Sequence, residues 1–209
     1  MKRESILLPV VSALAIGLLG ATPGPAATAF LETWAKTPSY STDIKVHETK
    51  GSDVQDRTYH YAYLKPHFAK IDVTGGSGRG GGVTWDGGDT VSGHQGGLLS
   101  GIHLKVSIHD ARAVSLRGDT IDSGSFQNMA DAIKAAASET VSEETVNGVV
   151  ADAIAVPYAD ANGATERVIV LSRATHLPVR RLTYAGDVVV KTEDFSNVNP
   201  AANLKESDF

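Results

Sequence analysis

The chain has 209 residues, of which 42% are hydrophobic, 6% aromatic and 21% charged, and its formal net charge is -5 at pH 7. This mildly acidic balance argues against a nucleic-acid-binding protein, because phosphate groups require clustered lysine and arginine side chains. The sequence contains no cysteine, which excludes disulfide bonds and thiolate metal sites. Its 21 glycines and small aromatic content predict a core of valine, isoleucine, leucine and alanine, a composition that favours strands over helix bundles.

The N-terminal residues have the layout of a secretory signal peptide. Lys2 and Arg3 precede an apolar run over residues 6–20, and a stretch of small residues follows over 21–29. The run is shorter than the roughly 20 apolar residues that a membrane span requires. We therefore expect an exported protein, with a retained membrane anchor as the alternative.

Cleavage of this signal peptide is expected after Ala27 or after Ala29, where the small residues give an A-x-A pattern. Residues 1–27 are then the signal peptide, and residues 28–209 are long enough for a single domain with its own core. No repeat or low-complexity linker indicates a second domain. We expect residues 28–209 to be the exported domain.

The first half of the chain is predicted to form a short helix followed by strands. The helix is expected over residues 29–36, where apolar residues lie three or four apart, and alternation with a period of two follows over 40–50. The clearest strand signal comes next, because Tyr59, Tyr61 and Tyr63 all fall on one face of an extended chain. This alternation predicts a sheet with one buried side.

Tight turns separate the strands that follow. Ile71 and Val73 share one face of a further strand, and the Asp-Gly-Gly-Asp turn at residues 86–89 predicts a hairpin. A short strand is expected over 90–94, and residues 102–108 alternate again. These segments together predict an antiparallel series of strands.

One strong helical signal interrupts the strands in the middle of the chain. Either Ser123 or Ser125 can cap the N-terminus of this helix. Apolar residues then recur at intervals of three or four. The stripe consists of Phe126, Met129, Ala130, Ile133 and Ala137. A helix with such an apolar face must cover another element, and the sheet is the element available.

Strand patterns return in the last third of the chain. Asn147 with Gly148, and Asn162 with Gly163, are strong hairpin signals between them. The strands are expected over 140–146, 149–158, 166–172 and 178–195, the last broken by a turn at 184–187. Because a sheet of this size cannot bury its inner face unaided, we predict a mainly β fold with α: a curved antiparallel sheet, an unclosed half-barrel, covered by a few helices.

The sequence contains no catalytic or metal-binding motif. Gly76, Gly78 and Gly81 match the letters of a dinucleotide-binding loop, but a strand follows them where that motif needs a helix, so we interpret them as a glycine hairpin loop. The seven histidines lack the spacing that places two imidazoles on one side of a strand or helix. We therefore expect no cofactor, no metal site and no enzymatic activity.

Several short motifs resemble those of the LolA-type carriers of outer-membrane lipoproteins. In the first half of the chain they are a basic-proline pair before an aromatic residue and a Trp-Asp-Gly-Gly turn. In the second half they are a closing hairpin and an asparagine-containing tail. The residues concerned are 63–68, Lys70, 85–88, 177–181, Tyr184, Gly186, 194–195 and 199–200. The resemblance covers most of the chain after the signal peptide.

This resemblance implies a monomeric, non-enzymatic periplasmic carrier with an apolar cleft between the curved sheet and its helices. Its expected partners are the acyl chains of lipids or lipoproteins, and the lipoprotein machinery of the inner or outer membrane. The residues expected to contact the acyl chains are Tyr63, Phe68, Ile71, Val73, Trp85, Met129, Ile133, Val168, Val170 and Leu182. The alternative is an envelope structural or signalling domain that binds a protein partner, because a packed interior requires the same residue types as a cleft.

Overall fold

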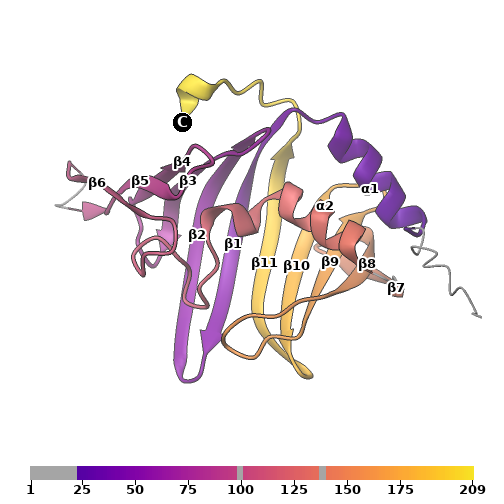
Figure 1. Ribbon diagram of the computed structural model, residues 1–209. Helices are drawn as coiled ribbons and strands as arrows, with labels where there is room; N and C mark the ends of the chain where they lie inside the picture. Colours follow the sequence, from indigo (N-terminus) through magenta and orange to yellow (C-terminus); the bar gives the residue numbers. More distant parts are fainter. Residues whose placement is uncertain (1–22, 98–100, 137–139) are drawn as a thin grey trace, which may run out of the picture.

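The computed structural model describes residues 23–97, 101–136 and 140–209. Within these residues, eleven strands form one antiparallel sheet in the order β6-β5-β4-β3-β2-β1-β11-β10-β9-β8-β7. The sheet is not closed, because β6 and β7 lie at its two edges. The prediction of a curved, unclosed antiparallel sheet covered by helices is confirmed (Figure 1).

The strands are β1 Ser39–Lys50, β2 Asp53–Leu64, β3 Phe68–Gly76, β4 Gly82–Trp85, β5 Thr90–His94, β6 His103–Ser107, β7 Thr140–Val146, β8 Val149–Pro157, β9 Glu166–Ser172, β10 Pro178–Ala185 and β11 Val188–Asn199. The helices are α1 Pro25–Ala35 and α2 Phe126–Ala135, with short 3-10 helices η2 Ile121–Gly124 and η3 Glu206–Asp208. None of the helices in the described ranges combines the length and the apolar character needed to cross a membrane.

Tight turns connect strands that are neighbours in both sequence and space. Asn147 and Gly148 have φ angles of 51° and 82°, which form the predicted hairpin between β7 and β8. The predicted turn between β4 and β5 is also present, with Gly87 at a φ of 90°. The pairing of β1 with β11 is different, because it places Ile44 opposite Phe195 and so joins the first and last thirds of the chain.

Helix α2 begins where the sequence predicts. The hydroxyl oxygen of Ser125 accepts a hydrogen bond from the backbone N–H of Asn128 at 3.0 Å and so caps the helix. Figure 1 shows α2 crossing in front of β1, β11 and β10, with α1 beside it. Helix α2 ends at Ala135, and Ala137 of the predicted apolar stripe lies outside the described residues.

Helix α1 is longer than predicted at its N-terminus. It begins at Pro25, whose fixed φ suits the first turn of a helix, and not at residue 29. Ala27 is fully buried in this helix. Both expected cleavage positions, after Ala27 and after Ala29, lie within α1. Removal of a signal peptide stays a prediction.

Aromatic side chains fill the concave face of the sheet under the two helices. The Phe126 ring of α2 stacks on Tyr40 of β1 with ring centroids 4.0 Å apart, and the Phe126 N–H donates to the Tyr40 hydroxyl at 3.1 Å. Such pairs add about 0.5–1.5 kcal/mol beyond the area they bury. The members of this set, termed the aromatic cluster, are Phe30, Trp34, Tyr40, Tyr61, Tyr63, Phe126 and Phe195, all of them buried.

Candidate functional site

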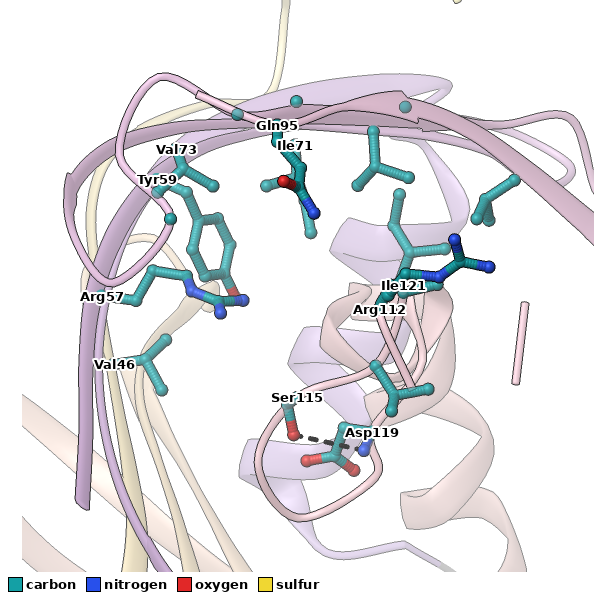
Figure 2. A pocket seen from close by; sticks show the side chains of 18 of the residues that line it. Val46, Arg57, Tyr59, Ile71, Val73, Gln95, Arg112, Ser115, Asp119 and Ile121 are labelled. Carbon is teal, nitrogen blue, oxygen red and sulfur yellow. Dashed lines mark hydrogen bonds between the residues drawn. The ribbon is translucent and has the colours of Figure 1, made fainter. Parts of the chain in front are cut away.

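A pocket of about 630 Å³ lies on the concave face, beside the aromatic cluster. Strands β1 to β6 form its wall, and its floor is residues 112–124, termed the covering segment, which lead from β6 toward α2. Figure 2 shows Arg57 and Tyr59 on one side of the pocket and Arg112 and Ile121 on the other. The pocket is partly open to solvent.

Valine and isoleucine side chains form the apolar part of the wall. Every second residue of a strand faces the same side of the sheet, so the alternation in the sequence directs these side chains inward. The strand register places Ile71 of β3 opposite Val83 of β4, and Val91 of β5 opposite Val106 of β6. With Val73, they give the pocket an apolar surface that spans four strands.

Glycines allow two segments of the wall to pack closely. A Cβ atom on Gly96 would lie 1.9 Å from the carbonyl oxygen of Arg79, and one on Gly93 would lie 2.7 Å from that of Gly82. A side chain at either position would therefore force the backbone segments apart. The glycine-rich segment between β3 and β4 forms a hairpin loop, as predicted, and it closes one side of the pocket.

Buried ion pairs fasten the covering segment to the sheet. The carboxylate of Asp119 accepts hydrogen bonds from Lys191 Nζ and Arg167 Nη2, both at 2.7 Å. Lys191 Nζ also lies 3.3 Å from Glu193, whose carboxylate accepts two hydrogen bonds from Arg181 at 2.5 and 2.8 Å. These five side chains, each no more than 10% exposed, are termed the ionic network.

The charges of the ionic network keep one another ionised. Burial raises the pKa of Glu193, but Arg181 and Lys191 lower it by more, to about 2. Burial also raises the pKa of Asp119, and the charges of Lys191 and Arg167 outweigh this effect, so the pKa lies well below its usual value. Burial lowers the pKa of Lys191, yet Glu193 and Asp119 together raise it. At neutral pH the network therefore holds the covering segment with full charges.

A second set of contacts holds the same segment near its middle. Arg117 donates two hydrogen bonds to the carboxylate of Asp160, at 3.0 and 2.8 Å, and a third to the backbone carbonyl of Thr49 at 2.8 Å. Glu48 Oε1 accepts a hydrogen bond from the N–H of Leu116 at 3.0 Å. The pocket is thus preformed by contacts within the chain, as small-molecule sites usually are.

The sequence-predicted contact residues are distributed over three parts of the molecule. Ile71 and Val73 line the pocket. Tyr63, Met129 and Ile133 instead lie buried in the core under α1 and α2. Two of the predicted residues therefore share the pocket, and these three share the packed region beneath the helices.

Phe68 and Trp85 lie on neighbouring strands outside the pocket lining. The Phe68 ring is 5.8 Å from the ring of Phe209. Trp85 packs against the edge of the core, and its indole N–H donates to the carbonyl oxygen of Gly88 at 2.7 Å. Their contact with acyl chains stays a prediction.

Val168, Val170 and Leu182 belong to a different surface. Val168 and Val170 pack in a second, smaller cluster around Val146, whereas their neighbours on β9 face the main core. Leu182 of β10 lies opposite Val168 in the register. These three residues are therefore on the face of the sheet that points away from the pocket, and a role in lipid contact stays a prediction for them too.

The ionic network is the feature that sequence reasoning missed. Lys191 and Glu193 occupy inward positions of β11, in the same alternation as the buried Phe195. Glu48 likewise continues the inward stripe of Val46 on β1. A charged residue at an inward position of an alternating strand could have indicated a buried charge. Charged residues are seldom buried unless they are paired, however, and the partners of these residues lie far away in sequence.

Histidines also come together in a way that spacing along one strand could not predict. The pairing of β5 with β6 places the rings of His94 and His103 side by side, with centroids 5.3 Å apart. His94 lies at the pocket rim. Across residues 23–97, 101–136 and 140–209, no group of three or more His, Asp or Glu side chains is arranged to hold a metal ion.

No protein-family model and no curated protein matches the chain. Among solved structures, the chain is similar to a DUF1329 family protein from Desulfovibrio piger, with 11% identity over 88% of this chain and 95% of that one and a TM-score of 0.48. It is similar to the lipoprotein LppX of Mycobacterium tuberculosis, with 12% identity over 86% of this chain and 96% of that one and a TM-score of 0.46.

A LolA superfamily protein from Nitrosomonas europaea is also similar, with 10% identity over 90% of this chain and 98% of that one and a TM-score of 0.44. The resemblance to LolA-type carriers that the sequence motifs predict is thus found again among solved structures, as a likeness of fold.

Proposed function

We propose that this protein is a non-enzymatic binding or carrier protein that shelters an acyl chain of a lipid or lipoprotein in the pocket above the covering segment. The observation that carries the proposal is the pocket itself, about 630 Å³ in volume and walled by valine and isoleucine side chains. Sites for small molecules typically enclose about 300–1,000 Å³. Burial of a hydrocarbon chain against such a wall is favourable by about 25 cal/mol per Å².

The fastening of the covering segment supports this proposal. Asp119 pairs with Lys191 of β11 and Arg117 pairs with Asp160 in the β8–β9 loop, so both anchor the covering segment to the part of the chain that follows α2. A hollow that the chain itself keeps open spares the ligand the cost of opening it. A domain that only binds a protein partner through its surface has no use for such a hollow, so the pocket favours the carrier over this alternative.

The proposal also places the protein in the periplasm, in keeping with the predicted signal peptide. There an acyl chain cannot cross the aqueous space unprotected, because its exposed methylene groups each cost about 0.8 kcal/mol. The proposed partners are lipids or lipoproteins and the membrane machinery that donates or accepts them. The proposed contact residues are Ile71 and Val73, with Tyr59, Val83 and Val106 beside them.

Uptake of a fluorescent acyl probe by delipidated protein tests this function, together with native mass spectrometry of lipids that co-purify with the untreated protein. The variant Val73→Asp places a charge in the pocket wall and is expected to weaken uptake at least about tenfold, because a carboxylate is costly beside hydrocarbon. Val54→Asp is the matched control, since Val54 lies on the neighbouring strand β2 and is 61% exposed.

Circular dichroism and thermal unfolding of both variants separate lost uptake from lost folding. The proposal requires that the wild type and Val54→Asp take up the probe alike. A wild-type protein that purifies without lipid and takes up no acyl probe would overturn it. Equal uptake by folded Val73→Asp and wild type would show that acyl chains bind at another place.

A further inference from the structure

The charged residues that line the pocket differ in whether another side chain compensates them. Asp119, Lys191 and Glu193 belong to the ionic network and compensate one another. Arg112 donates two hydrogen bonds, both of 2.8 Å, to the carboxylate of Asp110. Glu48 also lines the pocket; its carboxylate accepts a hydrogen bond from the N–H of Leu116 and forms no ion pair with any side chain in the described residues. The charges of the ionic network and Arg112 are therefore already paired.

Arg57 has no such partner. It is an inward-facing residue of β2, opposite Val46, and Figure 2 shows its guanidinium group directed into the pocket. Its Nε atom donates to the carbonyl oxygen of Ser77 at 3.0 Å. Within the described ranges, no carboxylate lies within the 4.0 Å salt-bridge distance of this guanidinium, so its two Nη atoms keep their donors free.

Arg79 adds a second positive charge at the same rim. The hydrogen bond from Arg57 to Ser77 fixes the β3–β4 loop beside the Arg57 side chain, and Arg79 follows in that loop and lines the pocket. Arg79 is exposed, and it forms no ion pair with any carboxylate in the part of the chain that the structure describes. The rim therefore carries two uncompensated guanidinium groups next to the apolar wall.

A ligand in this pocket removes water from the Arg57 guanidinium. Removing water from a charge without supplying an opposite charge or hydrogen-bond acceptors costs free energy. An uncharged ligand therefore binds here less tightly, because it does not compensate this cost. A carboxylate or a phosphate instead accepts two parallel hydrogen bonds from a guanidinium group. The arrangement thus selects for an anionic group at the end of an apolar chain.

We propose that the ligand is an anionic amphiphile, whose hydrocarbon chain lies along Ile71 and Val73 and whose carboxylate or phosphate group pairs with Arg57 at the rim. Arg79 strengthens the attraction as a second, more exposed charge. This inference rests on the proposed function and narrows its substrate class. It assigns to Arg57 a role in ligand specificity.

Calorimetric titration of delipidated protein with three ligands of one chain length tests this inference. Hexadecanoate supplies the carboxylate, hexadecyl phosphate supplies the phosphate, and hexadecan-1-ol is the uncharged ligand, each used below its aggregation limit. We expect at least one anion to bind about tenfold more tightly than the alcohol, as a charged hydrogen-bonded pair allows. The anion that binds more tightly identifies the head group.

The variant Arg57→Gln is expected to weaken binding of that anion about tenfold and to change binding of the alcohol less than about twofold. Arg57→Lys keeps the charge without the planar fork and should recover part of the loss. Lys45→Gln is the matched control, because it removes one positive charge from an exposed position on the neighbouring strand β1. This control should bind all three ligands as the wild type does.

The outcomes separate this inference from the proposed function. If the alcohol binds as tightly as both anions and Arg57→Gln changes nothing, the anionic specificity is overturned while the acyl-binding function stands. If Lys45→Gln weakens anion binding as much as Arg57→Gln, the effect belongs to net charge and the role of Arg57 is overturned. If none of the three ligands binds, the proposed acyl-binding function is itself overturned, and the anionic specificity with it.

Discussion

The concave face of the sheet is filled at one end and hollow at the other, and strand β2 passes through both regions. Tyr61 and Tyr63 lie in the aromatic cluster, where the rings of Tyr40 and Tyr63 are 5.9 Å apart. Two and four residues before Tyr61 on the same face, Tyr59 and Arg57 line the pocket. One unbroken alternation therefore serves a packed core and a cavity.

The difference between the two regions comes from what covers them. Helix α2 stacks the ring of Phe126 on that of Tyr40, with centroids 4.0 Å apart, and both side chains are fully buried. The covering segment lies across a hollow instead, and its residues at the pocket range in size from Gly124 and Ala113 to Ile121 and Arg112. Alternation in a strand thus predicts which side chains face inward, but the position of the element that lies opposite decides whether the space is filled.

The largest expected effect comes from emptying the filled region. Phe126→Ala removes a fully buried ring from the aromatic cluster and should lower the free energy of unfolding by about 4 kcal/mol. Val73→Ala, in the pocket wall, should cost only about 1 kcal/mol, because its side chain already borders open space. Urea unfolding of both variants measures the contrast, and similar losses would show that the pocket region is packed as tightly as the cluster.

Removal of one charge from the ionic network should have the next largest effect. Glu193→Gln leaves Arg181 and Lys191 buried without their shared carboxylate and is expected to cost about 3 kcal/mol. Glu143→Gln is the control, because its pair with Arg173 is exposed and should be worth less than about 1 kcal/mol. If urea unfolding gave the same loss of stability for Glu193→Gln and Glu143→Gln, the ionic network would not be what fastens the covering segment to the sheet.

The same network predicts how stability depends on acid. The pKa of Glu193 is depressed from 4.5 to about 2, so its contribution to stability is present above pH 4.5 and is lost as the pH falls toward 2. The depressed pKa of Asp119 acts in the same direction. Thermal unfolding across this range should show the decline, and Glu193→Gln should flatten it. A flat profile in the wild type would contradict the network as a source of stability.

Filling the pocket should have the smallest effect on stability and the clearest effect on function. Val73→Phe enlarges a side chain that points into the pocket, so it should change the free energy of unfolding by less than about 1 kcal/mol while it blocks acyl uptake. Ala130→Phe enlarges a fully buried residue of α2 and should cost about 1–3 kcal/mol. Thermal unfolding and probe uptake of the two variants would show a reversed pattern if the hollow were under α2.

Local features of the fold follow from local sequence. The inward face of Tyr59, Tyr61 and Tyr63 and the turn at Asn147 are where the sequence places them, and Ser125 is one of the two serines that it offers as the cap of α2. Each depends on residues close together in the chain, through strand alternation, a side-chain cap or a positive φ.

The candidate site depends on contacts between distant residues, and the sequence predicts it less well. Ile71 and Val73 line the pocket because their strand alternates, as expected. The inward charges Lys191 and Asp119 are separated by 72 residues, so no local pattern indicates that they pair. The hollow likewise depends on where the covering segment lies opposite the strands, and only the folded chain brings these parts together.

The seam between β1 and β11 has a consequence for how the pocket can be assembled. Strands β1 to β6 supply its wall, but the residues that anchor its floor, Arg167 and Lys191, come from β9 and β11. An N-terminal fragment that stops before β7 would therefore contain β1 to β6 but lack the partners of Asp119, and it would also lack Lys191 and Glu193, which line the pocket from β11. Ligand binding becomes possible only once both ends of the polypeptide have met, which makes uptake a readout of completed folding.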